Sequence, residues 1–202
     1  RALSARAEAR GLRLDERGLW RGEDRVDCPS EQVMYETLGC QWIPPELREG
    51  TTEVELAGNG TIPELVNLED LRGVLHNHTT DSDGTDSLEA MASAARNRGW
   101  EFFGVADHSP VASYANGLSA DRLRDQGKRI DRLNATQSGM RVVKGIEADI
   151  LPDGGLDIPE GCEEELEYVV ASVHSAFRLA MDVQTDRLVR GVSRRAGGVV
   201  GH

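Results

Sequence analysis

The residues of this sequence that can do metal chemistry are few, and they occur in short motifs. All five histidines belong to them: His76, His78, His108, His174 and His202. His76 and His78 flank a single residue. On an extended strand the period of two would point both imidazoles to the same side, where they could chelate one ion. Imidazole binds zinc, manganese and iron alike, whereas carboxylate partners favour hard or borderline metals.

Carboxylates accompany the histidines. The segment TTDSDG places Asp81 and Asp83 just past the first histidine pair, and Gly84 lets the backbone turn tightly near a bound ion. The segment GIEAD places Glu147 and Asp149 on one face of an extended segment. Glu147 could bridge two ions because a carboxylate has two oxygens.

Such a set of ligands predicts metal-assisted hydrolysis of a phosphate ester. Two ions about 4 Å apart polarise a phosphoryl oxygen and activate water near neutral pH. The sequence has no glycine-rich phosphate loop, since GNG and DGG are too short for one, and no GxSxG nucleophile motif. A nucleophilic water molecule is therefore expected in place of a nucleophilic side chain.

The elements that must position these residues follow a repeated strand, loop and helix pattern from residue 72 onward. The expected strands are 72–78, 101–108, 140–150, 167–174 and 197–202, and the expected helices are 87–98, 119–134 and 185–192. This alternation predicts an α/β fold with a parallel sheet covered by helices. Four of the strands end in a histidine and the fifth carries Glu147 near its end. The carboxyl ends of parallel strands form the functional face of such folds.

The first 50 residues follow a different pattern. A short helix is expected over 2–10, an alternating stretch follows, and a second helix over 30–38 has Ser30 as its N-cap. Consecutive prolines then exclude further helix. Residues 51–71 are predicted to be a linker with short local structure.

Composition limits the class of protein. The chain has 23 basic and 35 acidic residues, a net charge of −12, which argues against a large basic surface for nucleic acid and is compatible with a site that collects cations. Three scattered cysteines, Cys28, Cys40 and Cys162, argue against a disulfide framework or a zinc ribbon. No secretory signal and no apolar run of about 18 residues occurs, so we expect a cytoplasmic protein without a membrane partner.

The motifs occur in a recognisable series: LHNHTTDSDG, ADHS followed by ANGLS, GIEADIL and SVHS. Their order and spacing over roughly residues 70–202 resemble the PHP (polymerase and histidinol phosphatase) superfamily. The ANGL element and the segment DGGLDIPE are most similar to the PHP domain of bacterial family X DNA polymerases. RGLRLDERGLWRG and EQVMYETLGCQWIPPELREG resemble the end of the thumb of that polymerase.

The resemblance implies a distorted TIM-like (βα)7 barrel, here truncated after about five strands and preceded by a small α+β thumb fragment. Up to three divalent ions, Mn²⁺ or Zn²⁺, would be bound. By motif, the three ions would be held as follows: the first by His76 and His78, the second by His174 and His202, and the third by Asp83 and His108, with Glu147 as a bridge between the first two. The catalytic set would be His76, His78, Asp83, Glu147 and His174.

The resemblance also implies boundaries. Residues 1–50 would be the C-terminal part of the thumb, 51–71 a linker, and 72–202 the N-terminal portion of the PHP domain. Val74 stands where family members usually have Asp. Two further ligands, an Asp and a His, would lie beyond the last residue. We therefore expect a fragment of a larger enzyme. Alone it should be marginally stable or associate, because a barrel cut after five strands has two open edges.

The function implied is a manganese- or zinc-dependent phosphoesterase. It would act on DNA 3′ ends, gapped or damaged, as a 3′→5′ exonuclease within a bacterial, nucleoid-associated repair polymerase. Two alternatives remain: a phosphatase of a small phosphomonoester such as histidinol phosphate, and a non-catalytic PHP module that supports a polymerase. The thumb-like residues favour DNA, and the net charge of −12 favours the small substrate. Tyr114, between His108 and the ANGL element, could line the pocket.

Overall fold

The computed structural model describes residues 1–136, 138–193 and 198–202. The chain divides into two compact units, Arg1–Val66 and Asn67–His202. Each unit has its own buried apolar cluster, so each is described by itself.

The N-terminal unit is a small α+β unit with a three-stranded antiparallel sheet. Its strands pair in chain order, and its helices pack around a core that includes Leu19, Leu38 and Ala57. The Ser30 hydroxyl accepts a hydrogen bond from the Val33 N–H at 3.3 Å, so the predicted N-cap is confirmed. The elements are α1 (Ala2–Glu8), β1 (Arg13–Asp15), β2 (Gly18–Arg21), β3 (Asp24–Arg25), α2 (Glu31–Thr37), the 3₁₀ turn η1 (Pro45–Leu47) and α3 (Glu53–Asn59).

Part of the segment expected to be a linker, 51–71, packs with the N-terminal unit. Helix α3 lies inside it, and Ala57 is 1 % exposed in the core of that unit. The Ala57 carbonyl also accepts a hydrogen bond from the Gln41 N–H at 2.9 Å. The border between the units, after Val66, therefore falls within 51–71.

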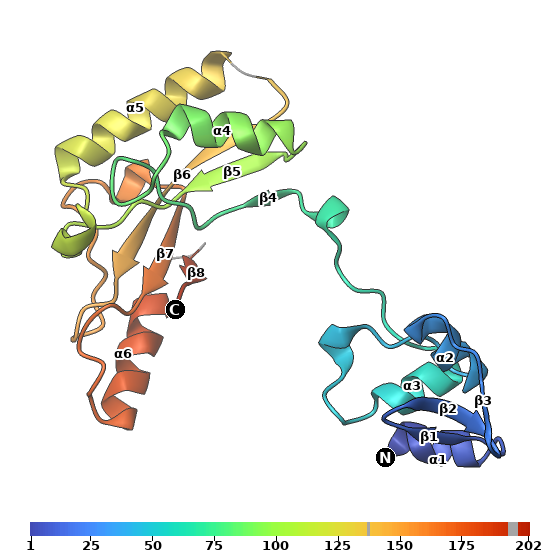
Figure 1. Ribbon diagram of the computed structural model, residues 1–202. Coiled ribbons are helices and arrows are strands. Elements are labelled where there is room, and N and C mark those ends of the chain that lie inside the picture. The colour runs from blue at the N-terminus through green and yellow to red at the C-terminus, as the bar shows by residue number, and fades with distance from the viewer. Residues whose placement is uncertain (137, 194–197) are drawn as a thin grey trace. The chain divides into compact units, whose positions relative to one another are not determined.

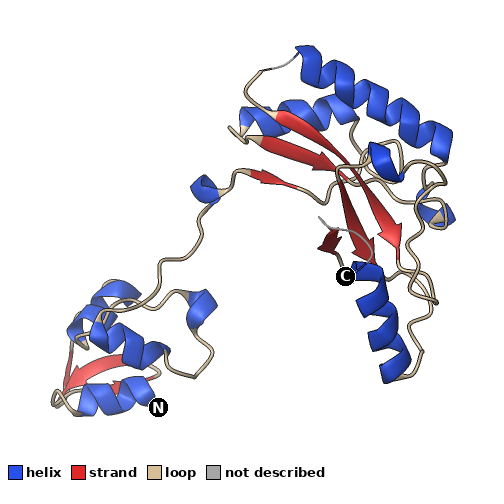
Figure 2. Ribbon diagram, turned by 180° about the vertical axis from the view of Figure 1, so that it is seen from behind, coloured by secondary structure: helices blue, strands red, loops and turns tan. Residues whose placement is uncertain are grey.

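The second unit is built on a five-stranded sheet whose strands are all parallel and lie in chain order. Figures 1 and 2 show it as a curled sheet. Sequential parallel strands with helices between them are the repeating pattern of a TIM-like barrel. The predicted α/β class is confirmed, and closure into seven strands stays a prediction. The strands are β4 (Gly73–Val74), β5 (Phe102–Val105), β6 (Arg141–Asp149), β7 (Tyr168–Ser172) and β8 (Gly198–Val200).

Among the described residues, three helices pack against one face of this sheet; a helical cover was predicted, but not its restriction to one face. Figure 1 shows α4 (Leu88–Asn97) and α5 (Ala120–Thr136) over β5 and β6, where the two helices share one apolar cluster with Phe103. Helix α6 (Met181–Ser193) packs near the end of β7 through Leu188. Short 3₁₀ turns complete the unit: η2 (Leu68–Asp70), η3 (Ser113–Ala115) and η4 (Glu163–Glu165).

The period of two along each strand separates this helix-covered face from an inner face. On β6, Val142 joins the cluster under the helices, whereas Val143 joins a different cluster that contains Tyr168 and Val170. Residues 145, 147 and 149 share the parity of Val143 and so lie on the inner face. Glu147 is therefore placed inside the curl of the sheet.

Tyr168 fills the inner face, and two glycines make room for it. A Cβ at Gly145 would lie 2.3 Å from the Tyr168 ring, and one at Gly104 would lie 2.6 Å from its hydroxyl oxygen. The hydroxyl donates to the carbonyls of Leu75 and Val105, the latter at 2.9 Å. The ring thus ties three neighbouring strands together.

The predicted first strand, 72–78, is correct only at its start. Pairing with β5 ends at Val74, so His76 and His78 lie past the strand. The Asn77 side chain donates to the Gly104 carbonyl at 2.9 Å, and the Asn77 carbonyl accepts from the Ala106 N–H at 2.8 Å. Past Val74, hydrogen bonds of Asn77 therefore connect this segment to the β5 segment in place of regular strand pairing.

The last predicted strand, 197–202, is observed as β8, and Gly197 lies outside the described residues. Among the helices of the described segments, none is long and apolar enough to cross a membrane.

Candidate metal centre

Glu147 occupies the middle of a cluster of histidines on the inner face. It lies near the end of β6, and its side chain is 1 % exposed. Its N–H donates to the Asp107 carbonyl at 3.1 Å, and its own carbonyl accepts from the Ser109 N–H at 3.0 Å. These two bonds fix Glu147 beside the end of β5, next to His108.

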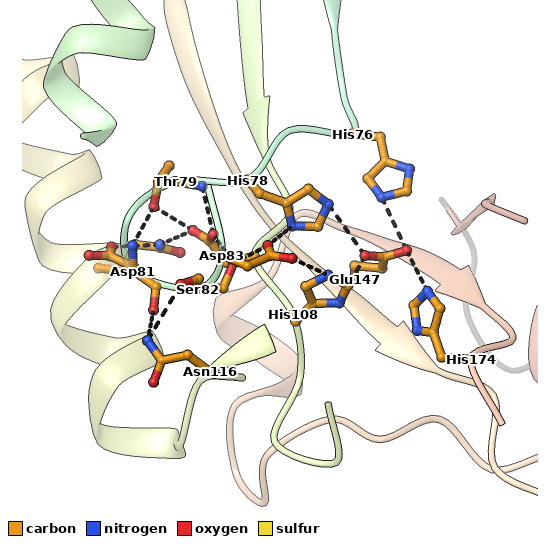
Figure 3. A network of polar contacts seen from close by, with 12 residues as sticks. His76, His78, Thr79, Asp81, Ser82, Asp83, His108, Asn116, Glu147 and His174 are labelled. Atoms are coloured by element: carbon orange, nitrogen blue, oxygen red, sulfur yellow. Dashed lines mark hydrogen bonds and ion pairs between the residues drawn. The ribbon is translucent and has the colours of Figure 1, made fainter. Parts of the chain in front are cut away.

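All five histidines point a ring nitrogen at the Glu147 carboxylate, and Figure 3 shows Glu147 among four of them, His76, His78, His108 and His174. The two oxygens face different sets. Oε1 lies 3.1 Å from His76 Nε2, 3.4 Å from His174 Nε2 and 3.6 Å from His202 Nε2. Oε2 lies 3.4 Å from His78 Nε2 and 3.0 Å from His108 Nδ1.

Asp83 closes the other side of the cluster. Its oxygens lie 3.6 Å from His78 Nδ1 and 3.6 Å from His108 Nε2, so these two imidazoles stand between two carboxylates. Asp83 lies on a tight turn in which the Ser82 and Gly84 N–H groups both donate to the Thr79 carbonyl. A Cβ at Gly84 would lie 2.4 Å from the His78 carbonyl oxygen, so the turn requires glycine there.

The short distances in the cluster are not hydrogen bonds. Among the described side chains of the cluster, four buried atoms have no hydrogen bond of normal geometry: both oxygens of Glu147, Nδ1 of His78 and Nδ1 of His108. A buried carboxylate without such partners costs several kcal/mol. Divalent ions would remove this cost, so the donor set fits a metal centre. Three overlapping groups have ligand atoms within 4.8 Å of one another: His76, His78 and Glu147; His78, Asp83 and His108; and His108, Glu147 and His174.

The protonation states suit ligands. Burial, and next the imidazole of His108, lowers the pKa of His78, so the ring stays neutral. Burial alone would raise the pKa of Glu147, but the neighbouring Ser172 hydroxyl and the imidazoles of His76 and His108 bring it below its ordinary value. A neutral imidazole and an ionised carboxylate are the forms that bind metal.

A second layer of polar groups holds the turn that carries Asp83. Asp107 is 1 % exposed. It accepts from the Thr79 N–H and hydroxyl, both at 2.7 Å, from the Ser82 hydroxyl, and from Gln126 Nε2 at 2.6 Å. Asp81 accepts from Gln126 at 2.8 Å and from Arg129 at 2.8 and 2.9 Å. Two side chains of α5 are thereby connected to the turn.

Asp149 orients His174 in a similar way. Its Oδ1 lies 2.7 Å from His174 Nδ1, which leaves Nε2 directed at Glu147. Asp149 is 3 % exposed, and its N–H donates to the Ser109 hydroxyl at 3.3 Å. A carboxylate on the far nitrogen of a ligating histidine fixes the tautomer and raises the basicity of the ring.

All seven side chains expected as ligands lie in this one cluster. The grouping differs from the expected one in two respects: His78 and His108 each belong to two groups, and His202 stands apart from the three groups as a 68 % exposed side chain. The sequence placed Asp149 on the same face as Glu147 without assigning it a role, and it did not indicate the role of Asp107. Gln126 and Arg129 were missed, because helix residues about 40 positions from the turn carry no local signal of this contact.

Tyr114 lies at the rim of the cluster. Its ring centroid is 6.2 Å from that of His108 and 6.4 Å from that of His174. Burial, followed by the charges of Asp149, Glu147 and Asp83, raises the pKa of Tyr114, so the phenol stays protonated.

Comparisons with known proteins agree with this geometry. Residues 1–49 match the DNA polymerase beta thumb family. Over 198 residues, 97 % of the chain, the sequence is 39 % identical to the DNA polymerase/3′-5′ exonuclease PolX of Bacillus subtilis. The chain is thus similar to a family X DNA polymerase along nearly its whole length. The recognition of a PHP domain of a family X polymerase, with the end of the thumb at its N-terminus, is confirmed.

Other relatives match a shorter stretch of the chain. A probable phosphatase of Acetivibrio thermocellus is 35 % identical over 101 residues, which is 49 % of this chain and 39 % of that protein. A probable phosphatase of a Thermoanaerobacter species is 27 % identical over 133 residues, which is 63 % of this chain and 51 % of that protein. The chain spans 34 % of the length of the Bacillus PolX.

Proposed function

We propose that this chain carries a metal-dependent phosphoesterase site that hydrolyses phosphodiester bonds at DNA 3′ ends, as part of a bacterial repair polymerase. The observation that supports it best is the buried Glu147 carboxylate, which faces five imidazoles without a hydrogen bond of normal geometry among the described residues. This set of imidazole and carboxylate donors favours catalysis by bound divalent ions over catalysis by a nucleophilic side chain.

In this proposal the seven ligands divide by exposure. Glu147 and His108 are 1 % and 9 % exposed, and they hold the floor of the site. Asp83 and His202 are 46 % and 68 % exposed, so the open side between them admits a phosphate group. Bound Mn²⁺ or Zn²⁺ would polarise a phosphoryl oxygen and lower the pKa of a water molecule. His76, His78, Asp83, Glu147 and His174 fix the geometry of that reaction.

DNA is the proposed substrate because of what precedes the site. Residues 1–49 match a polymerase thumb, and the relative that covers nearly the whole chain is described as both a polymerase and a 3′-5′ exonuclease. We assign residues 1–50 to the thumb and 72–202 to the PHP domain, with 51–71 as the connection. Gapped or damaged DNA and the rest of the polymerase are the proposed partners, in the bacterial cytoplasm.

A second candidate is a phosphatase of small phosphomonoesters. The observation that favours it is the match of about half of the chain to a probable phosphatase. A non-catalytic PHP module is the third. These candidates differ in substrate and in whether any turnover occurs, so one set of assays separates them.

The test is digestion of a 5′-labelled DNA primer by the chain in Mn²⁺, with histidinol phosphate hydrolysed in parallel. A ladder of 3′-shortened products is expected from the wild type, and its loss is expected in Glu147→Gln, which keeps the shape of the side chain but removes its charge. Glu160→Gln, an exposed position outside the cluster, is the matched control and should digest normally.

Each result identifies one candidate. Phosphate release from histidinol phosphate without a ladder would replace the proposal by the phosphatase. Metal binding without turnover of either substrate would favour the structural module. A ladder that persists in Glu147→Gln would show that the nuclease activity resides elsewhere.

A further inference from the structure

Tyr114 is an exposed aromatic residue at the rim of the candidate metal centre. Its side chain belongs to a residue that is 71 % exposed, yet its ring lies beside His108 and His174, at 6.2 and 6.4 Å between centroids. Both imidazoles share a candidate ion group with Glu147. One side of the Tyr114 ring therefore faces the two imidazoles, and the other side is open to a ligand that enters the site.

The loop that presents Tyr114 is held firmly. Its neighbours Ala112 and Ala115 are 0 % and 2 % exposed, so buried alanines anchor the turn on both sides of the exposed ring. The Val111 N–H donates to Asp157 at 2.7 Å. Asn116 adopts a left-handed conformation, with φ 57°, and its side chain donates to the Asp81 carbonyl at 3.2 Å. A ring on such a turn is preorganised, and an aromatic side chain loses little rotamer freedom on contact.

We propose that Tyr114 is a base-stacking platform for a nucleotide next to the scissile phosphate, so the site selects substrates that carry a base there. This inference rests on the proposed function. A phosphate between the exposed ligands would place the base of the same nucleotide within reach of a ring about 6 Å from two of the imidazoles. Base–aromatic stacking tolerates any sequence, because every base has a π-face.

The charge of the protein favours stacking over a basic groove as the source of affinity. The chain carries a net charge of −12, so its overall field repels a polyanion. Contacts that remain favourable in such a field are phosphate to metal and base to aromatic ring. The ring supplies the second contact without adding charge.

The test compares two 5′-labelled oligonucleotides that differ only in their last two nucleotides, thymidine in one and abasic in the other. For Tyr114→Leu, kcat/KM on the thymidine oligonucleotide should fall about 5- to 150-fold, the change that corresponds to ~1–3 kcal/mol for one stack. It should stay unchanged on the abasic oligonucleotide. Tyr114→Phe keeps the ring and should behave as the wild type on both. Phe177→Leu is the matched control, since Phe177 is 70 % exposed in the same unit.

Binding gives a readout that does not depend on turnover. An oligonucleotide with 2-aminopurine in the last two positions and phosphorothioate linkages should lose fluorescence on binding to the wild type and to Tyr114→Phe, but not to Tyr114→Leu. Quenching without cleavage of any DNA would contradict the proposed function and leave the stacking role intact. The stacking role would be overturned by equal losses on the thymidine and abasic substrates, by a defect in Tyr114→Phe, or by unquenched 2-aminopurine with the wild type.

Discussion

At the scale of single residues, the cluster depends on groups shared between ion positions. Glu147 belongs to two of the three candidate ligand groups, and His78 and His108 also belong to two each. A substitution at any of these three side chains should therefore affect two ions at once. His76, Asp83 and His174 each belong to one group, so their variants can separate the ion positions.

Asp149 gives a prediction at this scale. The Asp149→Asn substitution keeps the shape but removes the charge that holds His174 Nδ1 at 2.7 Å. We expect metal affinity to fall about 10- to 100-fold, as for other outer-shell carboxylates. Competition with a chromophoric chelator measures this. Asp182→Asn, an exposed position at the start of α6, should bind metal normally. Equal affinities for Asp149→Asn and the wild type would show that Asp149 has no part in the centre.

The residues of the cluster could be predicted because their types are rare in this chain. Only five histidines occur, and each follows a segment with strand-like apolar residues. The pairing of Asp149 with His174 could not be predicted, because a carboxylate on the same face of a strand as a ligand can bind metal, orient a ligand or do neither. Only the three-dimensional arrangement of the side chains distinguishes these roles.

At the scale of elements, helix α5 does more than cover the sheet. Its buried Gln126 bonds to both Asp81 and Asp107, and Arg129 pairs with Asp81. The turn that carries Asp83 is thus held from outside by a helix and from below by the end of β5. A shift of α5 along the sheet would move a candidate ligand.

The double substitution Gln126→Ala and Arg129→Ala tests this connection. We expect the ion held by Asp83 to bind more weakly while the others are retained, so metal counted by mass spectrometry after dialysis should fall by about one ion per chain. Circular dichroism should change little. Lys128→Ala, on the exposed side of the same helix, is the matched control. Unchanged metal content would mean that the turn keeps its shape without the helix.

Helix α2 of the N-terminal unit gives a pH prediction. Hydrogen bonds from Arg48 and then Trp42 lower the pKa of Glu31 below its ordinary value. The folded pKa lies below the unfolded one, so this pair stabilises the unit above the ordinary Glu pKa and ceases to do so as pH falls through the lowered value. Glu31 is 46 % exposed, which limits the contribution to less than about 1 kcal/mol.

Urea unfolding at different pH values measures the contribution of the Glu31–Arg48 pair to stability. Fluorescence of Trp20 and Trp42, in a Trp100→Phe background, should show a midpoint that falls between about pH 7 and about pH 3. The fall should be smaller in Glu31→Gln, whereas Glu36→Gln on the same helix should match the wild type. Identical slopes in all three chains would contradict a role for the pair.

The expected elements largely agree with the observed ones, and the exception has a physical cause. Apolar periodicity predicted a strand through His78, yet the ladder ends at Val74 because the Asn77 side chain bonds to the Gly104 carbonyl. Strand propensity depends on a residue and its neighbours in the sequence. It cannot predict a hydrogen bond from the Asn77 side chain to a backbone carbonyl 27 positions away.

At the scale of the whole molecule, two separate cores imply two unfolding events. The candidate ligands all lie in Asn67–His202, so Mn²⁺ should raise the melting temperature of that unit alone. Ligand at 100 times its Kd stabilises by about 2.7 kcal/mol. Calorimetry with EDTA or Mn²⁺ should show one transition that shifts and one that does not. His78→Ala should abolish the shift, and a common shift of both transitions would show that the two units unfold together.

The fit of Tyr168 between Gly104 and Gly145 has a consequence for how such a sequence can diverge. A methyl group at either glycine would overlap the aromatic ring, and loss of the ring would leave a void beside two residues too small to fill it. Substitutions at these three positions are therefore coupled. Descendants that change one are expected to have changed another, and Gly145→Ala should be tolerated better once a smaller residue stands at 168.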